Sequence, residues 1–557
     1  MKVRFFSLLA ALIVIVAGFC IYLVVNHDKL TSNEETPSVT VTPAPTVTPQ
    51  PSVTPVPDDY ESAPGLYPAG QLIDGTMTYG YINSEGVFKI DPSFDSAGDF
   101  HDGIACVHMD GQYLAIDTTG TILYYSNNPI ADFHNGAAVV SRNSGEDTIY
   151  GYINTEGTEI IKPLYKFAGD FGADHTAYVY NGNGKYAQID QNGRSLNTYE
   201  LDSKYSPTFL GDGYIVYRTS KELYGVLNLQ GEEIFPAKYV DILYMGSDLF
   251  ALKKQNGDYY GMIQEIPYAL FTAKGEQLTD DTLFDLTGFY NGYASVTDST
   301  STYFIGKDGK EATSLPKYEG RGTVKLFGDV VKAQIDHDLI YSKADNTTIW
   351  QSDSTQTLKD GVTVKGVKFK SNRYVLVYYP QIEGLADATV QQQINTKLKD
   401  IFTAQRTKIK ESDRYSVDDS FKATILKNLL IIQRDGYDYG FGAAHGNPIM
   451  DFYYIDTTTG TFYQLKDLFL EGSNYMTVIN DIITADIAAS EKGMYSDGGF
   501  TGITEDQYFI LTQDTLTIYF YPYAIAPYAT GFPQFKIPLA NLYDYINFQG
   551  AFWGSFN

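Results

Sequence analysis

The chain has 557 residues, of which 43% are apolar and 15% aromatic, and this is enough apolar material for two or three packed domains. Its formal charge is −27, so its long-range field repels phosphate backbones and excludes nucleic acid as an expected partner. The 47 tyrosines and 32 phenylalanines favour strands, and we expect mainly β structure. Cys20 and Cys106 are the two cysteines, and Cys20 lies in an apolar N-terminal run, so no disulfide within the folded part and no CxxC zinc site is predicted.

Residues 5–25, FFSLLAALIVIVAGFCIYLVV, form an apolar run without a charge. At about 1.5 Å per residue, a helix of this length crosses the roughly 30 Å hydrocarbon layer of a membrane. Because Lys2 and Arg4 precede the run, residues 1–4 are expected in the cytoplasm and everything after Val25 outside. The run is longer than the usual apolar core of a cleaved signal peptide, which favours a single-pass signal anchor in the cell membrane. Secretion after signal cleavage is the alternative.

Residues 26–62 contain the segment PSVTVTPAPTVTPQPSVTPVP, which is rich in proline and threonine and carries no charge. Such a segment cannot bury a core and adopts an extended polyproline II conformation of about 3.1 Å per residue. We therefore expect a stalk that holds the folded part of the chain away from the membrane.

Residues 63–315 contain an internal repeat. TYGYINSEG at 78–86 is nearly identical to IYGYINTEG at 149–157. Looser copies follow at intervals of 34 to 44 residues, and the seven units end at Gly86, Gly120, Gly157, Gly193, Gly231, Gly275 and Gly309. Each unit predicts short strands joined by tight turns, in which glycine supplies a left-handed backbone conformation. Seven such units indicate a β-repeat array, either a propeller or an open β-solenoid.

Three of the units open with an aromatic-glycine dipeptide, namely Tyr79-Gly80, Tyr150-Gly151 and Tyr224-Gly225. With the accompanying segments such as DFHDGIACV, this pattern resembles the WG-repeat family, whose Trp-Gly pair is replaced here by Tyr-Gly. The resemblance implies a β-repeat interaction module without assigned catalysis. His101 and His134 occupy the same repeat position after Asp-Phe, which indicates a role in the repeat itself. The pattern ends near residue 315, and residues 316–364 are expected to be a connecting region.

Residues 365–557 lack this period and predict one α+β domain. In GLADATVQQQINTKLKDIFTAQ, apolar residues recur on one face of a helix, including Ile394 and Leu398. Residues 474–492 predict a second amphipathic helix, and Thr459-Gly460 predicts the turn of a hairpin.

Four motifs occur in order in this domain: YYPQIEGL at 378–385, GFGAAHGN at 440–447, IDTTTGTFYQLKDLF at 455–469 and LTIYFYPYAIAPYATG at 516–531. Together they resemble a bacterial extracytoplasmic domain of unknown function. That domain also forms the outer part of the lysozyme-receptor anti-sigma factor and the N-terminal part of some peptidoglycan deacetylases. The resemblance implies a place in the cell envelope. Ala443 and Ala524 depart from the family's usual glycine and acidic residue, and either change could alter the ligand.

The sequence predicts neither catalytic residues nor a metal or cofactor, because it contains no HExxH or G-x-S-x-G pattern. Three roles are open for His445, beside Asp438 and Asp451 in the sequence: organising its loop by hydrogen bonds, contacting a ligand, or catalysis. Tyrosine is enriched at interfaces, which makes a tyrosine-rich set the candidate ligand-binding surface. The candidates are Tyr437, Tyr439, His445, Asn447, Tyr521, Tyr523 and Tyr528. Simple alternation of core and surface positions in YFYPY is the alternative interpretation.

Residues 435–557 carry 3 basic and 14 acidic residues, which favours a cationic partner. We therefore expect a membrane-anchored binding or sensor protein of the bacterial envelope that binds a basic protein such as lysozyme, or a cell-wall component. A peptidoglycan-modifying enzyme or accessory factor is the alternative.

Overall fold

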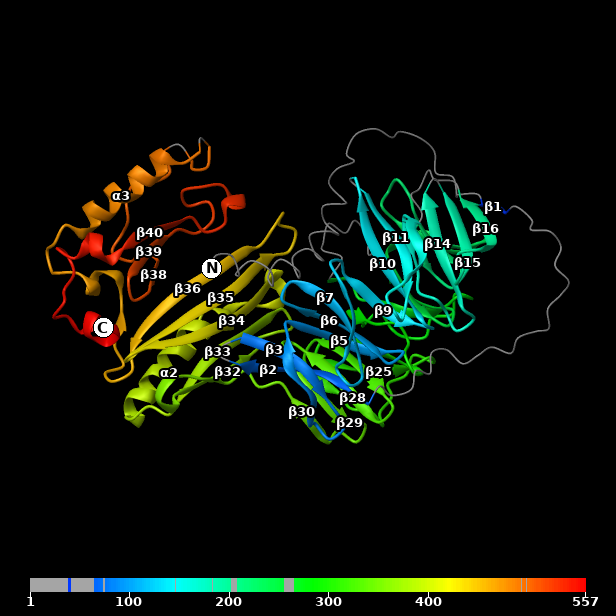
Figure 1. The fold of residues 1–557 in the computed structure, drawn as a ribbon, viewed down its shortest axis with the longest axis horizontal. Coiled ribbons are helices and arrows are strands. Elements are labelled where there is room, and N and C mark those ends of the chain that lie inside the picture. Colours follow the sequence, from blue (N-terminus) through cyan, green and yellow to red (C-terminus); the bar gives the residue numbers. More distant parts are fainter. Residues whose placement is uncertain are drawn as a thin grey trace.

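The computed structural model describes residues 39–41, 65–73, 76–145, 147–182, 184–201, 208–254, 265–491, 493–496 and 498–557. The predicted anchor at residues 5–25 lies outside these ranges, as does the predicted stalk except for strand β1 (Val39–Val41). No helix within the described ranges is both long enough and apolar enough to span a membrane. The described chain consists mostly of antiparallel sheets with few helices, which confirms the expected β-rich fold (Figure 1).

Seven sheets are formed by the described residues between 65 and 351, together with β1. In chain order, their strands are β2 (Tyr67–Ile73), β3 (Thr76–Ile82) and β4 (Phe88–Phe94); β5 (Ser96–His101), β6 (Ile104–Met109), β7 (Gln112–Asp117) and β8 (Ile122–Ser126); β9 (Ile130–His134), β10 (Ala137–Ser144), β11 (Asp147–Asn154) and β12 (Glu159–Tyr165); β13 (Phe167–Ala168), β14 (Thr176–Gly182), β15 (Lys185–Asp190) and β16 (Ser195–Leu201), with β1 paired to β16; β17 (Thr208–Gly211), β18 (Tyr214–Arg218), β19 (Tyr224–Asn228), β20 (Glu233–Gly246), β21 (Leu249–Lys254) and β22 (Ala269–Thr272); β23 (Asp285–Leu286), β24 (Tyr293–Thr297), β25 (Ser301–Gly306) and β26 (Tyr318–Glu319); and β27 (Gly322–Phe327), β28 (Val330–Ile335), β29 (Asp338–Lys343) and β30 (Thr348–Gln351).

The unit glycines have the left-handed backbone that the repeat predicts. All seven, from Gly86 to Gly309, have φ values between +74° and +84°. Some of them also lie close against a neighbouring sheet: a Cβ on Gly157 would come within 2.6 Å of the Tyr124 ring. The repeated TYGYINSEG-type stretch is therefore a structural element in which glycine permits both the turn and the close approach of the next sheet.

Buried tyrosine hydroxyls connect successive sheets at equivalent repeat positions. Tyr81 on β3 donates a hydrogen bond to the Gly98 carbonyl on β5 at 2.9 Å. Tyr152 on β11 donates in the same way to the Gly169 carbonyl at 2.7 Å. Each ring is fully buried, so its hydroxyl satisfies a carbonyl that water does not reach.

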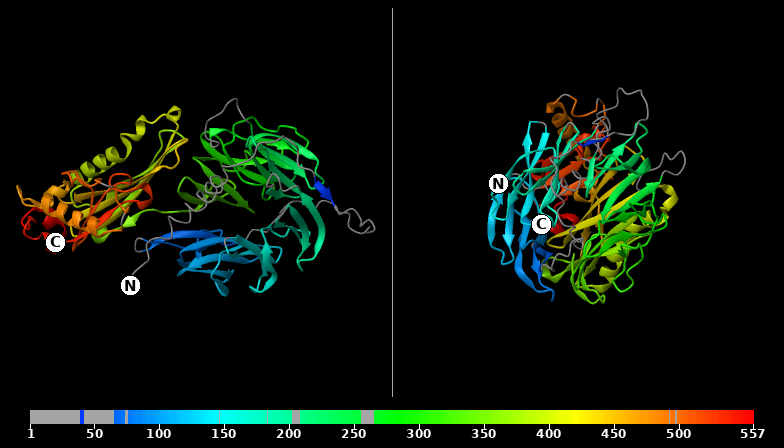
Figure 2. Two further views of the ribbon diagram at one scale, coloured as in Figure 1. Left: turned by 90° about the horizontal axis from the view of Figure 1, so that it is seen from above. Right: turned by 90° about the vertical axis from the view of Figure 1, so that its right-hand side faces the viewer.

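The last of these sheets packs against the first. Tyr341 on β29 donates a hydrogen bond to the Pro68 carbonyl on β2 at 2.8 Å, and this is the same type of contact between sheets 273 positions apart in sequence. Tyr67, on β2, and Phe327, on β27, belong to one buried apolar cluster. The sheets therefore follow one another around a ring (Figure 2).

Residues 316–364, expected as a connecting region, contain the four-stranded sheet β27–β30 that completes this ring. Its turns lack the unit glycine. Asp336 (φ +53°) and Asn346 (φ +71°) take the left-handed positions instead. Short polar side chains tolerate this conformation, so the sheet forms without the motif by which the other units were recognised.

The C-terminal region has a large sheet with helices and a small sheet around it (Figure 1). Its strands and helices are β31 (Gln356–Thr357), β32 (Thr363–Phe369), β33 (Val375–Glu383), α2 (Ala388–Thr403), β34 (Tyr415–Leu426), β35 (Leu429–Gly440), β36 (Asn447–Asp456), β37 (Phe462–Tyr463), α3 (Tyr475–Ala489), β38 (Phe509–Leu511), β39 (Thr515–Tyr519), β40 (Gln534–Pro538) and α4 (Ala551–Phe556). Short 3₁₀ helices are η3 (Lys359–Gly361), η4 (Arg406–Lys408), η5 (Glu411–Asp413), η6 (Leu465–Leu468), η7 (Tyr528–Thr530) and η8 (Leu539–Leu542). Strands β31–β37 form one sheet in that order, and β38–β40 form another.

Both faces of the large sheet are buried, and successive residues of β35 alternate between them. Leu430 belongs to the core that includes Ile394 and Leu398 of α2, as the helix periodicity predicted. Leu429 belongs to the second core, which includes Ile479 of α3 and the strands β38–β40. The Asp387 side chain begins α2 by accepting hydrogen bonds from the first-turn amides. The sheet is thus a rigid support for the loops at the end of β35 and β36.

Candidate functional site

Four of the predicted binding residues meet where β35 ends and β36 begins. Tyr437 is on β35, His445 is in the loop before β36, and Tyr523 and Tyr528 follow β39. The His445 ring stacks on Tyr528 at a centroid distance of 3.7 Å and an interplanar angle of 22°. Tyr523 lies beyond His445 at 5.8 Å and 27°. We call Tyr437, His445, Tyr523 and Tyr528 the aromatic cluster.

Hydrogen bonds fix the rings of the aromatic cluster. His445 Nδ1 is 3.1 Å from the Gly446 carbonyl oxygen, which can only accept, so Nδ1 carries the proton. In the neutral imidazole Nε2 is then an acceptor, and it receives the Tyr523 hydroxyl at 2.9 Å. Tyr528 donates to the Gly446 carbonyl at 2.8 Å, and the Gly446 amide donates to the Tyr437 hydroxyl at 2.9 Å. Each ring is therefore hydrogen-bonded either to the backbone amide or carbonyl of Gly446 or to another ring of the cluster.

Tyr523 is the most exposed tyrosine of the cluster, with 62% of its surface accessible. Its backbone has φ +71°, a left-handed conformation that is strained for an aromatic residue. Strain of this kind persists only where surrounding contacts hold it, and it is found most often at functional sites. Tyr437 is 45% exposed on the same cluster. The arrangement presents ordered aromatic surface to solvent.

Tyr521, also predicted in the site, contacts the edge of β36. Its hydroxyl accepts from the Met450 amide at 3.2 Å and donates to Asp451 Oδ1 at 2.8 Å. The Tyr519 hydroxyl donates to the Met450 carbonyl. In the described chain, β37 pairs with β36 only at Tyr454 and Ile455. Two tyrosines thus satisfy an earlier part of β36, which limits its pairing with another chain. Burial raises the pKa of the Asp451 carboxyl and outweighs the opposing hydrogen bond from Tyr521.

The remaining two predicted residues, Tyr439 and Asn447, are not members of the aromatic cluster. Tyr439, near the end of β35, donates to the Ala443 carbonyl at 3.1 Å and packs near Phe441 in the loop that follows. Asn447 begins β36, exposed and opposite Asp438 in the sheet register. Both belong to the hairpin that positions His445.

A buried charge network beneath the loop was not predicted. Asp419 is 0% exposed and binds Arg406 Nε at 3.0 Å and Arg434 Nη2 at 2.6 Å. Arg406 also binds both oxygens of Asp438 at 2.8 Å. Gly436 lies opposite Asp419 and leaves space for its carboxylate, because a Cβ there would be 2.2 Å from Asp419 Oδ1. The network holds η4 against β34 and β35, which end at the candidate site.

Asp438 binds Arg406 and Asp451 binds Tyr521, whereas the contacts of His445 within the described part of the chain are to Gly446, Tyr523 and Tyr528. The aspartates near His445 in sequence are thus not its hydrogen-bond partners. Among the described residues, no group of three histidine, cysteine, aspartate or glutamate side chains could hold a metal ion.

His101 and His134 connect neighbouring sheets of the ring. His101 Nε2 is 3.5 Å from Asp132 Oδ2, and His134 Nε2 is 3.7 Å from Asp170 Oδ2. In each case the histidine lies on one sheet and the aspartate at or after the first strand of the next. The repeated position predicted by the sequence is therefore a repeated contact between sheets.

Two family models match the chain. The model of the WG containing repeat matches residues 79–113, 150–186 and 224–259. The model of DUF3298, a family of proteins of unknown function, matches residues 466–540. No curated protein has detectable similarity to the chain.

Solved structures are similar over parts of the chain. A DUF3298 family member from Bacteroides fragilis has 18% identity and a TM-score of 0.27, covering 37% of this chain and 98% of its own. A DUF3298 family protein from Pseudomonas aeruginosa has 18% identity and a TM-score of 0.26, covering 35% and 95%. A eukaryotic initiation factor has 10% identity and a TM-score of 0.35, covering 49% and 93%. By the family models, the chain carries WG-containing repeats and, after them, a C-terminal DUF3298 domain.

Proposed function

We propose that this chain is a non-catalytic binding protein of the bacterial cell envelope, and that its aromatic cluster is the surface that binds a basic protein such as lysozyme. The observation that carries the proposal is the exposed Tyr523 ring, whose hydroxyl is bound by His445 and whose backbone is left-handed. An aromatic surface that is ordered before binding loses little conformational entropy when a partner arrives. Such rings typically carry most of the energy of an interface.

The charge of the C-terminal region supports a cationic partner. Residues 435–557 carry 3 basic and 14 acidic residues, so their formal balance is −11. Opposite charge accelerates encounter, and tyrosine faces attract ammonium and guanidinium groups. The resemblance of this region to the outer domain of the lysozyme-receptor anti-sigma factor points to the same class of partner.

We also propose that the ring of sheets is a β-propeller that serves as a spacer or protein-binding scaffold. In a propeller, the last sheet packs against the first, and the Tyr341–Pro68 hydrogen bond is such a contact. A propeller also protects its sheet edges without needing disulfides, which suits a chain with two cysteines.

Residues 5–25 are proposed to anchor the chain in the cell membrane, with the folded region outside. The test adds protease to intact, wall-stripped cells. The folded region should be degraded while a small membrane-bound fragment remains. Protection of the folded region would exclude this orientation, and its release into the medium before protease is added would favour secretion after cleavage.

Binding is tested by titrating the full chain in detergent micelles with lysozyme and with an unrelated protein of equal positive charge. We expect tighter binding of lysozyme, weakened at least about fivefold by Tyr523→Ala, since a hot-spot ring contributes more than about 1 kcal/mol. Tyr543→Ala is the matched control, because Tyr543 is also exposed in this region but lies outside the aromatic cluster. Raising the salt concentration should weaken both complexes by shortening the Debye length from about 10 Å at 0.1 M to about 3 Å at 1 M.

Two results would contradict the proposal: indistinguishable binding of the two basic proteins, or equal losses for Tyr523→Ala and Tyr543→Ala. Release of peptidoglycan fragments by the purified chain, abolished by His445→Ala, would instead establish the enzyme alternative.

A further inference from the structure

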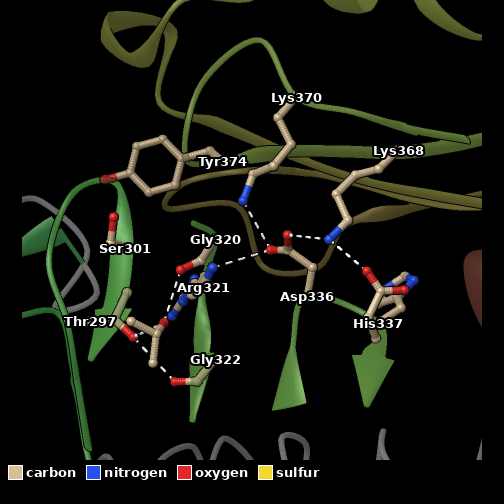
Figure 3. Close-up of polar contacts among 12 residues, drawn as sticks. Thr297, Ser301, Gly320, Arg321, Gly322, Asp336, His337, Lys368, Lys370 and Tyr374 are labelled. Carbon is tan, nitrogen blue, oxygen red and sulfur yellow. Dashed lines mark hydrogen bonds and ion pairs between the residues drawn. The ribbon is translucent and has the colours of Figure 1, made fainter. Parts of the chain in front are cut away.

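The ring and the C-terminal region meet at a buried aspartate. Asp336 lies at the turn between β28 and β29, and its side chain is 4% exposed. Two lysines bind it: Lys368 of β32 at 3.1 Å and Lys370, which directly follows β32, at 2.9 Å (Figure 3). The Arg321 amide donates to the same carboxylate at 3.2 Å. Burial alone would raise the pKa of Asp336, but the lysines outweigh it and the pKa is lowered, so the carboxylate is charged at neutral pH.

His337 follows Asp336 and is directed at two strands of the C-terminal sheet. Its Nε2 is 3.0 Å from Asp418 Oδ2 on β34. Its ring stacks on Tyr378 of β33 at a centroid distance of 5.1 Å and an angle of 10°. The Tyr378 hydroxyl in turn donates to Asp338 at 3.1 Å. His337 therefore contacts the C-terminal region through both its nitrogen and its ring face.

The charges around His337 do not balance while it is neutral. Three carboxylates face it from the turn, from β29 and from β34, and two ammonium groups come from β32 and the residue directly after it. These groups are Asp336, Asp338, Asp418, Lys368 and Lys370. A proton on His337 would supply the third positive charge. It would also convert the Asp418 hydrogen bond into an ion pair and the Tyr378 stacking into a cation–π contact.

We propose that His337 is a pH-sensitive clamp between the ring and the C-terminal region, and that its protonation tightens their docking. This inference does not rest on the proposed ligand. The other contacts across the junction keep their charge over the neutral range: Arg414 binds Glu265 at 2.8 Å, and Arg373 lies 4.1 Å over the Phe284 ring. These two contacts hold the ring and the C-terminal region together over the neutral range, while the protonation of His337 changes how tightly the two regions dock.

The direction of the pH effect follows from the pKa. The hydrogen bond to Asp418 raises the pKa of His337 above 6.5, with added effect from the charges of Asp418, Asp336 and Asp338, against the opposing effect of burial. A group whose pKa is raised on folding stabilises the folded state fully below its unfolded pKa. That contribution is lost as the pH rises through the folded pKa. Docking is therefore expected to be tightest below about pH 6.5 and to weaken towards pH 8.

The test is hydrogen–deuterium exchange of the full chain in detergent micelles between pH 6 and 8.5, expressed as protection relative to the intrinsic rate at each pH. Peptides covering β29, β33 and the start of β34 report the junction. Their protection should fall about two- to fivefold from pH 6.5 to 8, the range for a partly exposed ion pair. In His337→Gln and in Asp418→Asn this pH dependence should disappear.

His175→Asn is the matched control, because His175 is exposed on the ring with φ +56°, a conformation that asparagine accepts. It should retain the pH dependence at the junction. Peptides of β14 and β15 check that each variant is folded. An unchanged pH dependence in both His337→Gln and Asp418→Asn, or protection that increases with pH in the unaltered chain, would overturn the proposal.

Discussion

Gly436 shows how one residue permits the charge network under the candidate site. A Cβ at this position would be 2.2 Å from Asp419 Oδ1, which is closer than any normal contact. Asp419 cannot move away without losing Arg406 or Arg434, and a buried charge that loses its partners is strongly destabilising. Glycine is therefore required here for space and not for an unusual backbone angle.

Gly436→Ala is expected to lower the free energy of unfolding of the C-terminal region by about 1–3 kcal/mol, as overpacking typically does. Gly440→Ala is the control in the same strand, because its Cβ would meet only the Tyr415 ring at 3.7 Å, an ordinary contact. Urea denaturation followed by tyrosine fluorescence measures both. Equal midpoints for the two variants would mean that Asp419 has room to move.

The candidate site was partly predictable at the residue scale. Aromatic enrichment singled out Tyr523 and Tyr528, and the structure places both rings beside His445. It could not separate Tyr521, whose hydroxyl binds Met450 and Asp451, from Tyr523, whose ring is exposed. Tyr523 also has a left-handed backbone, with φ +71°, and no tyrosine-rich sequence indicates this conformation.

The repeat unit was predictable at the element scale because its turns require glycine. Gly157 has φ +74° in the turn, and a side chain at this position would collide with Tyr124. Two independent requirements therefore favour glycine at this position. The sheet β27–β30 has the same type of turns with Asp336 and Asn346, for which glycine is not needed. The last unit glycine is therefore Gly309, although the array continues to Gln351.

The closure of the ring is a property of the whole molecule. Gly86 on the first sheet would place a Cβ 2.5 Å from the Ile349 carbonyl oxygen on the last sheet, as Gly157 approaches Tyr124 between neighbouring sheets. Tyr341 bonds to Pro68 in the way that Tyr81 bonds to Gly98. The first and last sheets thus use the contacts that join consecutive sheets.

Tyr341→Phe should destabilise this closure, because it leaves the buried Pro68 carbonyl without a donor at a cost of about 1–3 kcal/mol. Hydrogen exchange should accelerate in β2 as well as in β29, since the two strands share the contact. Tyr125→Phe, at an exposed position of the ring, should change neither strand. Acceleration confined to β29 would indicate an open array whose ends are independent.

The sequence by itself determined the local structure of this protein: the turn positions through glycine, the strands through alternating apolar residues, and α2 through its periodicity and the Asp387 cap. These features depend on residues close together in the chain. Only the tertiary structure decided that the last sheet packs against the first and that Asp419 forms ion pairs with two arginines. It also decided that Asp336 and His337 contact the C-terminal region. These contacts join residues far apart in sequence, and their partners are specified by three-dimensional packing and not by local spacing.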